Sequence, residues 1–129
     1  MAWSSKFNAE LGIVESAFRG PTTGAEFTEQ TTAALALAKQ TGTTRHLIDS
    51  SELIFAASLA DLYLFPASRY ESEQVDRRSR IAILSPRDEK AREATHFYQV
   101  ACVNRGWSVQ MFADRQEAIG WLRGNAAGR

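Results

Sequence analysis

The hydrophobic pattern of the chain centres on one short stretch near its middle. Residues 46–49 (HLID) predict a short buried strand, because two consecutive apolar residues suit a strand that is covered on both faces. The polar run 49–52 is expected to break this strand. A second apolar group at 53–55 leads to a helix that begins near Ser58, where Leu59 and Leu62 fall at helical spacing. If the chain has a working site, we expect it at the carboxyl end of this strand.

Two strands and a helix are predicted before this stretch. Residues 3–9 are a weakly patterned first strand, and residues 11–19 alternate more clearly as a second. Strands this close would pair as a hairpin, and Gly20-Pro21 is expected to end the second. Thr23 and Glu26 have the spacing of a capping box, which predicts a helix over about 24–41 that stops at Gly42.

Two further strands and two helices are predicted after it. The helix near Ser58 is expected to end or kink at Pro66, and the polar stretch 68–80 predicts a helical turn and a loop. Residues 81–84 are wholly apolar and predict a central strand. Ser85 is expected to cap a helix over about 87–105.

The chain closes with a strand at 108–112 and a helix capped by Asp114, followed by a frayed tail. The order ββαβαβαβα predicts one α/β domain over residues 1–129. An initial β-hairpin would be followed by alternating helices and strands, giving a mixed, mostly parallel sheet with the helices largely on one side.

Composition narrows the function classes. The 15 basic and 15 acidic residues cancel, so no overall charge draws the protein to nucleic acid or a membrane surface. We expect no membrane span, because no run of about 18 apolar residues occurs, and no secretion signal. The single cysteine, Cys102, excludes an internal disulfide and suits a reducing cytosol, so a cytoplasmic location is expected.

Three segments stand out: LIDSSELIFAASLADL at 47–62, RIAIL at 80–84 and VQMFADRQEAIGWL at 109–122. Together they resemble the STAS domain, in particular its SpoIIAA-like branch, and the resemblance covers about residues 11–123. None is a catalytic signature. The resemblance implies a non-enzymatic regulatory module that binds a protein partner and forms a homodimer.

The resemblance also draws attention to Ser58. Anti-anti-sigma STAS domains carry an Asp-Ser-Ser/Thr-Gly-Leu turn whose first Ser or Thr accepts a phosphate from a partner kinase. Ser58 falls at that position, but Ala57 replaces the Asp and the Gly-Leu pair is missing. A phosphate at a helix N-terminus is favourable, so Ser58 is a candidate phosphoswitch. The plain alternative is that Ser58 only caps the helix.

The region from Asp49 to Tyr70 is the expected binding surface. It is rich in aromatic residues, and a surplus there could form an interface or line an apolar pocket. The rival function is therefore a carrier that holds a small apolar or lipid-like ligand between the 58–70 helix and the sheet. The candidate binding residues are Asp49, Ser50, Ser58, Tyr63, Phe65 and Tyr70.

Other chemistries find less support. His46 and Asp49 suggest a hydrolase triad, but on one strand they point to opposite faces, and no G-x-S-x-G elbow is present. The two histidines and one cysteine match no zinc spacing, so no metal is expected. No glycine-rich phosphate loop occurs, so no cofactor is expected. The basic cluster at 77–80 is balanced by nearby acids, and no nucleic-acid partner is expected.

Overall fold

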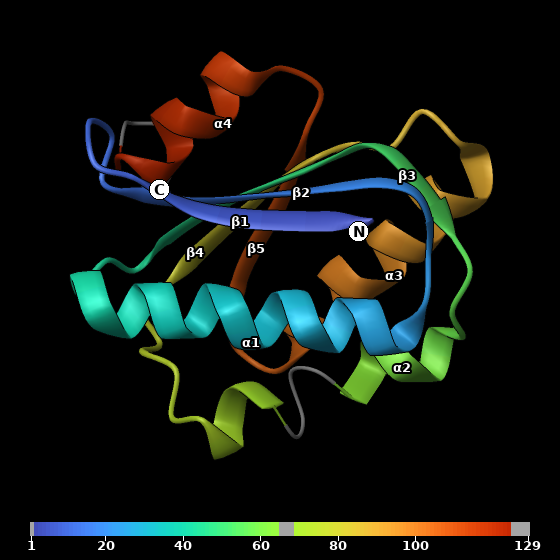
Figure 1. Ribbon diagram of the computed structural model, residues 1–129, viewed down its shortest axis with the longest axis horizontal. Helices are drawn as coiled ribbons and strands as arrows, with labels where there is room; N and C mark the ends of the chain where they lie inside the picture. The colour runs from blue at the N-terminus through green and yellow to red at the C-terminus, as the bar shows by residue number, and fades with distance from the viewer. Residues whose placement is uncertain (1, 65–68, 125–129) are drawn as a thin grey trace.

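A mixed sheet of five strands forms the centre of the computed structural model, which describes residues 2–64 and 69–124 (Figure 1). β1 pairs antiparallel with β2, and each later pair of neighbours is parallel. The predicted initial hairpin and mostly parallel sheet are thereby confirmed. The strands lie side by side in chain order: β1 (Trp3–Asn8), β2 (Ile13–Thr22), β3 (Arg45–Phe55), β4 (Arg80–Leu84) and β5 (Ser108–Phe112).

Helices cover both faces of this sheet unequally. α1 (Gly24–Thr41), α2 (Leu59–Leu64) and α3 (Glu89–Asn104) lie on one face, and α4 (Arg115–Leu122) lies on the other (Figure 1). This arrangement confirms the prediction of helices largely on one side. Consecutive parallel strands that are also neighbours place their crossover helices on the same face. α4 does not connect two of the described strands, so this rule does not place it.

The two faces enclose two hydrophobic cores. The larger core lies under α1, α2 and α3 and is rich in aromatic rings, among them Phe18, Phe27 and Tyr98. The rings of Phe18 and Phe27 have centroids 4.9 Å apart. The smaller core lies under α4 and consists of Ile13, Leu47, Ala82, Ala118, Trp121 and Leu122.

The ends of α1 follow the sequence signals, whereas α3 begins later than predicted. Thr23 and Glu26 form the predicted capping box, with Glu26 N donating to Thr23 Oγ1 over 3.3 Å. Gly42 ends α1 in the left-handed conformation at φ +77°, which glycine adopts without steric cost. Ser85 does not cap α3. Its backbone N–H bonds to Phe112 O on β5, and Asp88 caps the helix by accepting from Ala91 N over 3.0 Å.

β2 does not end at Gly20-Pro21 as predicted, because it continues to Thr22 beside β3. The pairing of β1 reaches only Phe18, so the outer edge of β2 is open where Pro21 lies. Proline has no N–H to donate to a ladder and is tolerated at such an edge.

α4 is tied to the first strands by an ion pair. Arg115 Nη2 lies 3.0 Å from Glu15 Oε2, and Asn8 Nδ2 donates to the same carboxylate oxygen over 2.6 Å. Burial alone would raise the pKa of Glu15, but hydrogen bonds from Arg115 and Asn8 lower it below its usual value. The last helix is therefore held against the N-terminal hairpin.

Candidate functional site

The polar run 49–52 does not break β3 as predicted. The strand continues through these residues and forms a β-bulge there. Ala17 pairs with Asp49 and Arg19 pairs with Glu52, so β3 carries one extra residue against β2. Asp49 Oδ1 accepts hydrogen bonds from Ser51 N over 3.0 Å and from Ser51 Oγ over 2.7 Å. These bonds give the extra residue a local polar partner, which explains why a polar run continues the strand.

The bulge changes which side chains face the larger core. Ile48 and Ser50 line a cavity on the α1 and α3 side of the sheet, and after the bulge Leu53 and Phe55 line the same cavity. Without the extra residue, strict alternation would turn the last two away. The bulge therefore builds the wall of this cavity.

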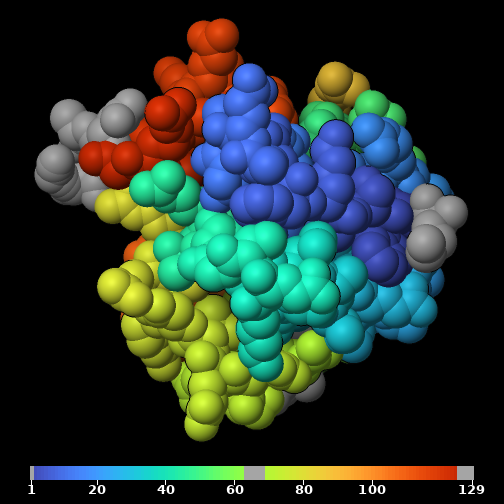
Figure 2. Space-filling view, turned by 60° about the vertical axis from the view of Figure 1, so that its left-hand side comes forward, coloured from blue at the N-terminus to red at the C-terminus, as the bar shows by residue number. Residues whose placement is uncertain are grey.

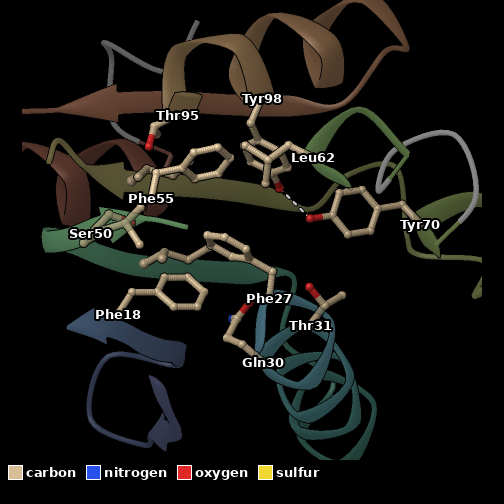
Figure 3. A pocket seen from close by; sticks show the side chains of 13 residues that line it. Phe18, Phe27, Gln30, Thr31, Ser50, Phe55, Leu62, Tyr70, Thr95 and Tyr98 are labelled. Carbon is tan, nitrogen blue, oxygen red and sulfur yellow. Dashed lines mark hydrogen bonds between the residues drawn. The ribbon is translucent and has the colours of Figure 1, made fainter. Parts of the chain in front are cut away.

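The cavity is small and mostly apolar (Figure 3). Its volume is about 50 Å³. That volume holds a few water molecules, since one water needs about 10–15 Å³, whereas drug-sized ligands occupy pockets of about 300–1,000 Å³. A lipid-like ligand would therefore need the surrounding helices to move apart. The side chains labelled in Figure 3 are Phe18, Phe27, Gln30, Thr31, Ser50, Phe55, Leu62, Tyr70, Thr95 and Tyr98.

Two tyrosine hydroxyls close one side of this cavity. Tyr70 and Tyr98 hydrogen-bond to each other through their phenol oxygens (Figure 3). Burial raises the pKa of both phenols, so both are neutral. Burial also raises the pKa of the Cys102 thiol, on the same helix as Tyr98, to about 12. The two phenols thus form a neutral hydrogen-bonded pair inside the core.

Ser58 lies on the surface at the start of α2. Asp61 N donates to Ser58 Oγ and Ser58 N donates to Asp61 Oδ2, each over 3.3 Å. This reciprocal pair is the capping-box pattern. The contacts of Ser58 are thus those of a helix cap, with the side chain open to solvent.

The six candidate binding residues do not converge on one place. Ser50 and Tyr70 are buried and line the cavity, while Ser58 is exposed. Asp49 is half-buried and belongs to the opposite face of the sheet from Ser50. The side chain of Tyr63 and all of Phe65 lie outside the described residues.

Sequence reasoning missed an exposed apolar stripe on α3. Phe97, Val100 and Val103 point away from the core, and the last two are 41% and 51% exposed. Leu59, at the start of α2, is 48% exposed, and α2 packs against α3. The signal was present as apolar residues three apart on the polar side of the predicted helix.

The described residues assemble neither a catalytic triad nor a metal site. His46 lies on the α1 side of the sheet and Asp49 on the α4 side, as their separation on one strand predicts. In the described ranges, no three His, Cys, Asp or Glu side chains are grouped so that they could hold a metal ion. Likewise, no helix within those ranges has the length and apolar character to cross a bilayer.

Comparison with known proteins identifies the fold. No family model matches the chain, and no curated protein does. Among solved structures, the chain is similar to the anti-sigma factor antagonist SpoIIAA in its unphosphorylated form, with a TM-score of 0.58 and 22% identity. The match covers 95% of this chain and 99% of that one. The chain has the STAS/SpoIIAA-like fold that its sequence segments predicted.

Proposed function

We propose that this chain, which has the STAS/SpoIIAA-like fold, is a non-enzymatic regulatory module. It binds another protein through the outer face of α3 and the start of α2. One observation carries the proposal: Phe97, Val100 and Val103 form an apolar stripe on the outside of α3. Exposed apolar clusters with polar surroundings are typical of protein interfaces. Glu93 and Asn104 supply polar surroundings toward the two ends of this helix face.

The partner class follows from the structural likeness. The similar solved structure is an anti-sigma factor antagonist, so we propose an anti-sigma factor as the partner, in the cytoplasm. A non-enzymatic role agrees with the separation of His46 and Asp49 across the sheet, because a nucleophile, a base and an orienting acid must meet in one place.

The test measures binding between the purified chain and each anti-sigma factor of its source organism by calorimetry. At least one is expected to bind. Val100→Glu is expected to weaken that binding at least tenfold by placing a charge in the apolar contact. Ala36→Glu, on the exposed side of α1, is the matched control and should leave it unchanged. Absence of binding to all of them, or equal weakening by both variants, contradicts the proposal.

The same surface is our candidate for homodimer formation. Sedimentation velocity of the wild-type chain and of Val100→Glu tests whether this surface also binds a second copy of the chain. A wild-type dimer that becomes a monomer in the variant places a second copy of the chain on α3. A wild-type monomer at all accessible concentrations rules the homodimer out.

A phosphoswitch at Ser58 is a second candidate, favoured by the exposure of Ser58 at the N-terminus of α2. Backbone N–H groups at a helix start stabilise a phosphate, while the carboxylate of Asp61 would repel it. Ser58→Asp is expected to weaken binding of the anti-sigma factor, with Ser58→Ala as the uncharged control. Unchanged binding in Ser58→Asp counts against the switch.

The carrier of an apolar ligand is a third candidate, favoured by the apolar lining of the cavity between α2 and the sheet. It predicts an added mass of a few hundred daltons in native mass spectra of freshly purified protein. A clean mass of the chain alone speaks against it, in agreement with the cavity volume of about 50 Å³.

A further inference from the structure

His46 is a buried polar side chain that hydrogen-bonds to none of the residues the structure describes. It lies near the start of β3, on the α1 side, with 7% of its surface exposed. Within residues 2–64 and 69–124, its imidazole takes part in none of the hydrogen bonds. Burial lowers its pKa to about 4, so the ring is neutral at physiological pH. Its nitrogens are not among the fully buried unpaired atoms, and the side chain lines two hollows, so a small molecule can reach the imidazole.

Two hollows meet at this side chain. The inner one, of about 30 Å³, is bounded by α1, by Ile48 and Ile81 of the sheet and by Trp107. Trp107 is itself 5% exposed, and among the described residues its buried Nε1 has no hydrogen-bond partner. Two nine-tenths-buried polar side chains, neither hydrogen-bonded within the described part of the chain, therefore line one small hollow.

The outer hollow is a surface groove of about 220 Å³. It lies between the C-terminal half of α1 and residues 73–79, which Figure 2 shows beside α1 on the surface. Lys39 Nζ and Glu73 Oε1, one from each side, lie 3.6 Å apart. Leu35, His46, Val75 and Ser79 line both hollows, so the groove leads from the surface to the imidazole.

The lining defines the chemistry of the occupant. No charged side chain of the described chain lines the inner hollow, so an ionised group there would lose its hydration without a counter-ion. A neutral imidazole donates from one nitrogen and accepts at the other, which a hydroxyl group can match in either sense. The walls formed by Leu35, Val75 and Ile81 suit a hydrocarbon or aromatic body.

We infer that this groove binds a small neutral hydroxyl compound, of the size of a phenol or short alcohol, whose hydroxyl hydrogen-bonds to His46. The site opens at the ends where β3 and β4 begin, whereas Ser58 follows the end of β3. Binding at this groove therefore does not depend on the proposed protein interaction.

A matched pair of probes tests the hydrogen bond. Phenol and toluene have nearly the same shape, and toluene lacks the hydroxyl. Each is titrated into the full chain while the ring resonances of His46 are followed by NMR. Phenol is expected to shift them saturably and to bind at least tenfold more tightly than toluene. Absence of a saturable shift with phenol means that water alone occupies the hollow and overturns the inference. Equal affinity for the two probes overturns the role of His46.

A pair of variants on α1 tests the location without altering the sheet. Ala38 lines the groove, and Ala36 is exposed on the same helix. Ala38→Phe is expected to fill the groove and abolish the shift with phenol, while Ala36→Phe retains it. Retained binding in Ala38→Phe would place the probe elsewhere and overturn the assignment. The comparison of phenol with toluene on the wild-type chain tests the inference even if Ala38→Phe fails to fold.

Discussion

Tyr70 and Tyr98 share a hydrogen bond between their phenol oxygens, and both side chains are buried. Tyr70 follows α2 in a helical turn at 69–72, and Tyr98 belongs to α3. The edge of one further ring, Trp107, meets Tyr70 at a centroid distance of 5.6 Å. The pair thus holds the helical turn at 69–72 against α3.

The first prediction concerns this pair. Tyr70→Phe is expected to lower the free energy of unfolding by about 1–2 kcal/mol, because it leaves a buried hydroxyl of Tyr98 with one partner fewer. Urea unfolding measures the change. Tyr98→Phe and the double variant complete a double-mutant cycle, in which the two losses should be less than additive. Strict additivity would show that the hydroxyls do not interact.

The second prediction concerns acid stability and His46. The folded pKa of about 4 lies below the ordinary value of about 6.5, so the unfolded chain binds the proton more readily. The stabilisation is complete above pH 6.5 and is lost as the pH falls toward 4, by about 3 kcal/mol in total. Urea unfolding at a series of pH values between 6.5 and 5 measures the slope.

His46→Phe is the control for that slope. The carboxyl groups of Glu15, Glu26 and Asp76, whose pKa values are also lowered, titrate only at more acid pH. The variant should therefore show a flat stability between pH 6.5 and 5. A slope equal to that of the wild-type chain would assign the proton uptake to another group.

The third prediction concerns the reactivity of Cys102. Its side chain is fully buried, and burial raises the thiol pKa to about 12. Because the thiolate is the reactive form, the native thiol should react with a disulfide reagent at pH 8 roughly 100-fold more slowly than in urea. The absorbance of the released thiolate follows the reaction. Equal rates in the native and unfolded protein would contradict a closed core around α3.

The fourth prediction concerns the bulge of β3. Asp49→Ala removes both hydrogen bonds to Ser51 and is expected to lower the free energy of unfolding by about 1–2 kcal/mol. Asp49→Asn keeps an oxygen acceptor at the same place and should recover most of the loss. Urea unfolding of the two variants compares them. If alanine and asparagine destabilise equally, the acceptor oxygen is not what supports the bulge.

Local sequence signals predicted most of the fold because they act over a few residues. The capping box at Thr23, the stop at Gly42 and the cap at Asp114 each depend on backbone groups within one helical turn. The predicted strand ends were wrong where residues that are distant in sequence but close in space determine the structure. The polar run after Asp49 continues as a strand because β2 pairs beside it, and Pro21 fits because the edge beyond β1 is open.

The candidate site was harder to predict for the same reason. Nothing along the sequence shows that Tyr70 turns inward to meet Tyr98, since the two residues belong to different elements. The hollows beside His46 are formed by α1, the sheet and residues 73–79 together. Sequence spacing did separate His46 from Asp49, because alternation along a strand is a local rule.

The chain-order arrangement of the strands has a consequence for synthesis. Each strand after β1 docks beside the one made just before it, so most sheet contacts join segments that emerge close in time. The ion pair of Arg115 with Glu15, between residues 100 positions apart, is different. This ion pair can form only after α4 has been synthesised. α4 therefore packs onto the sheet late and joins its C-terminal part to the N-terminal hairpin.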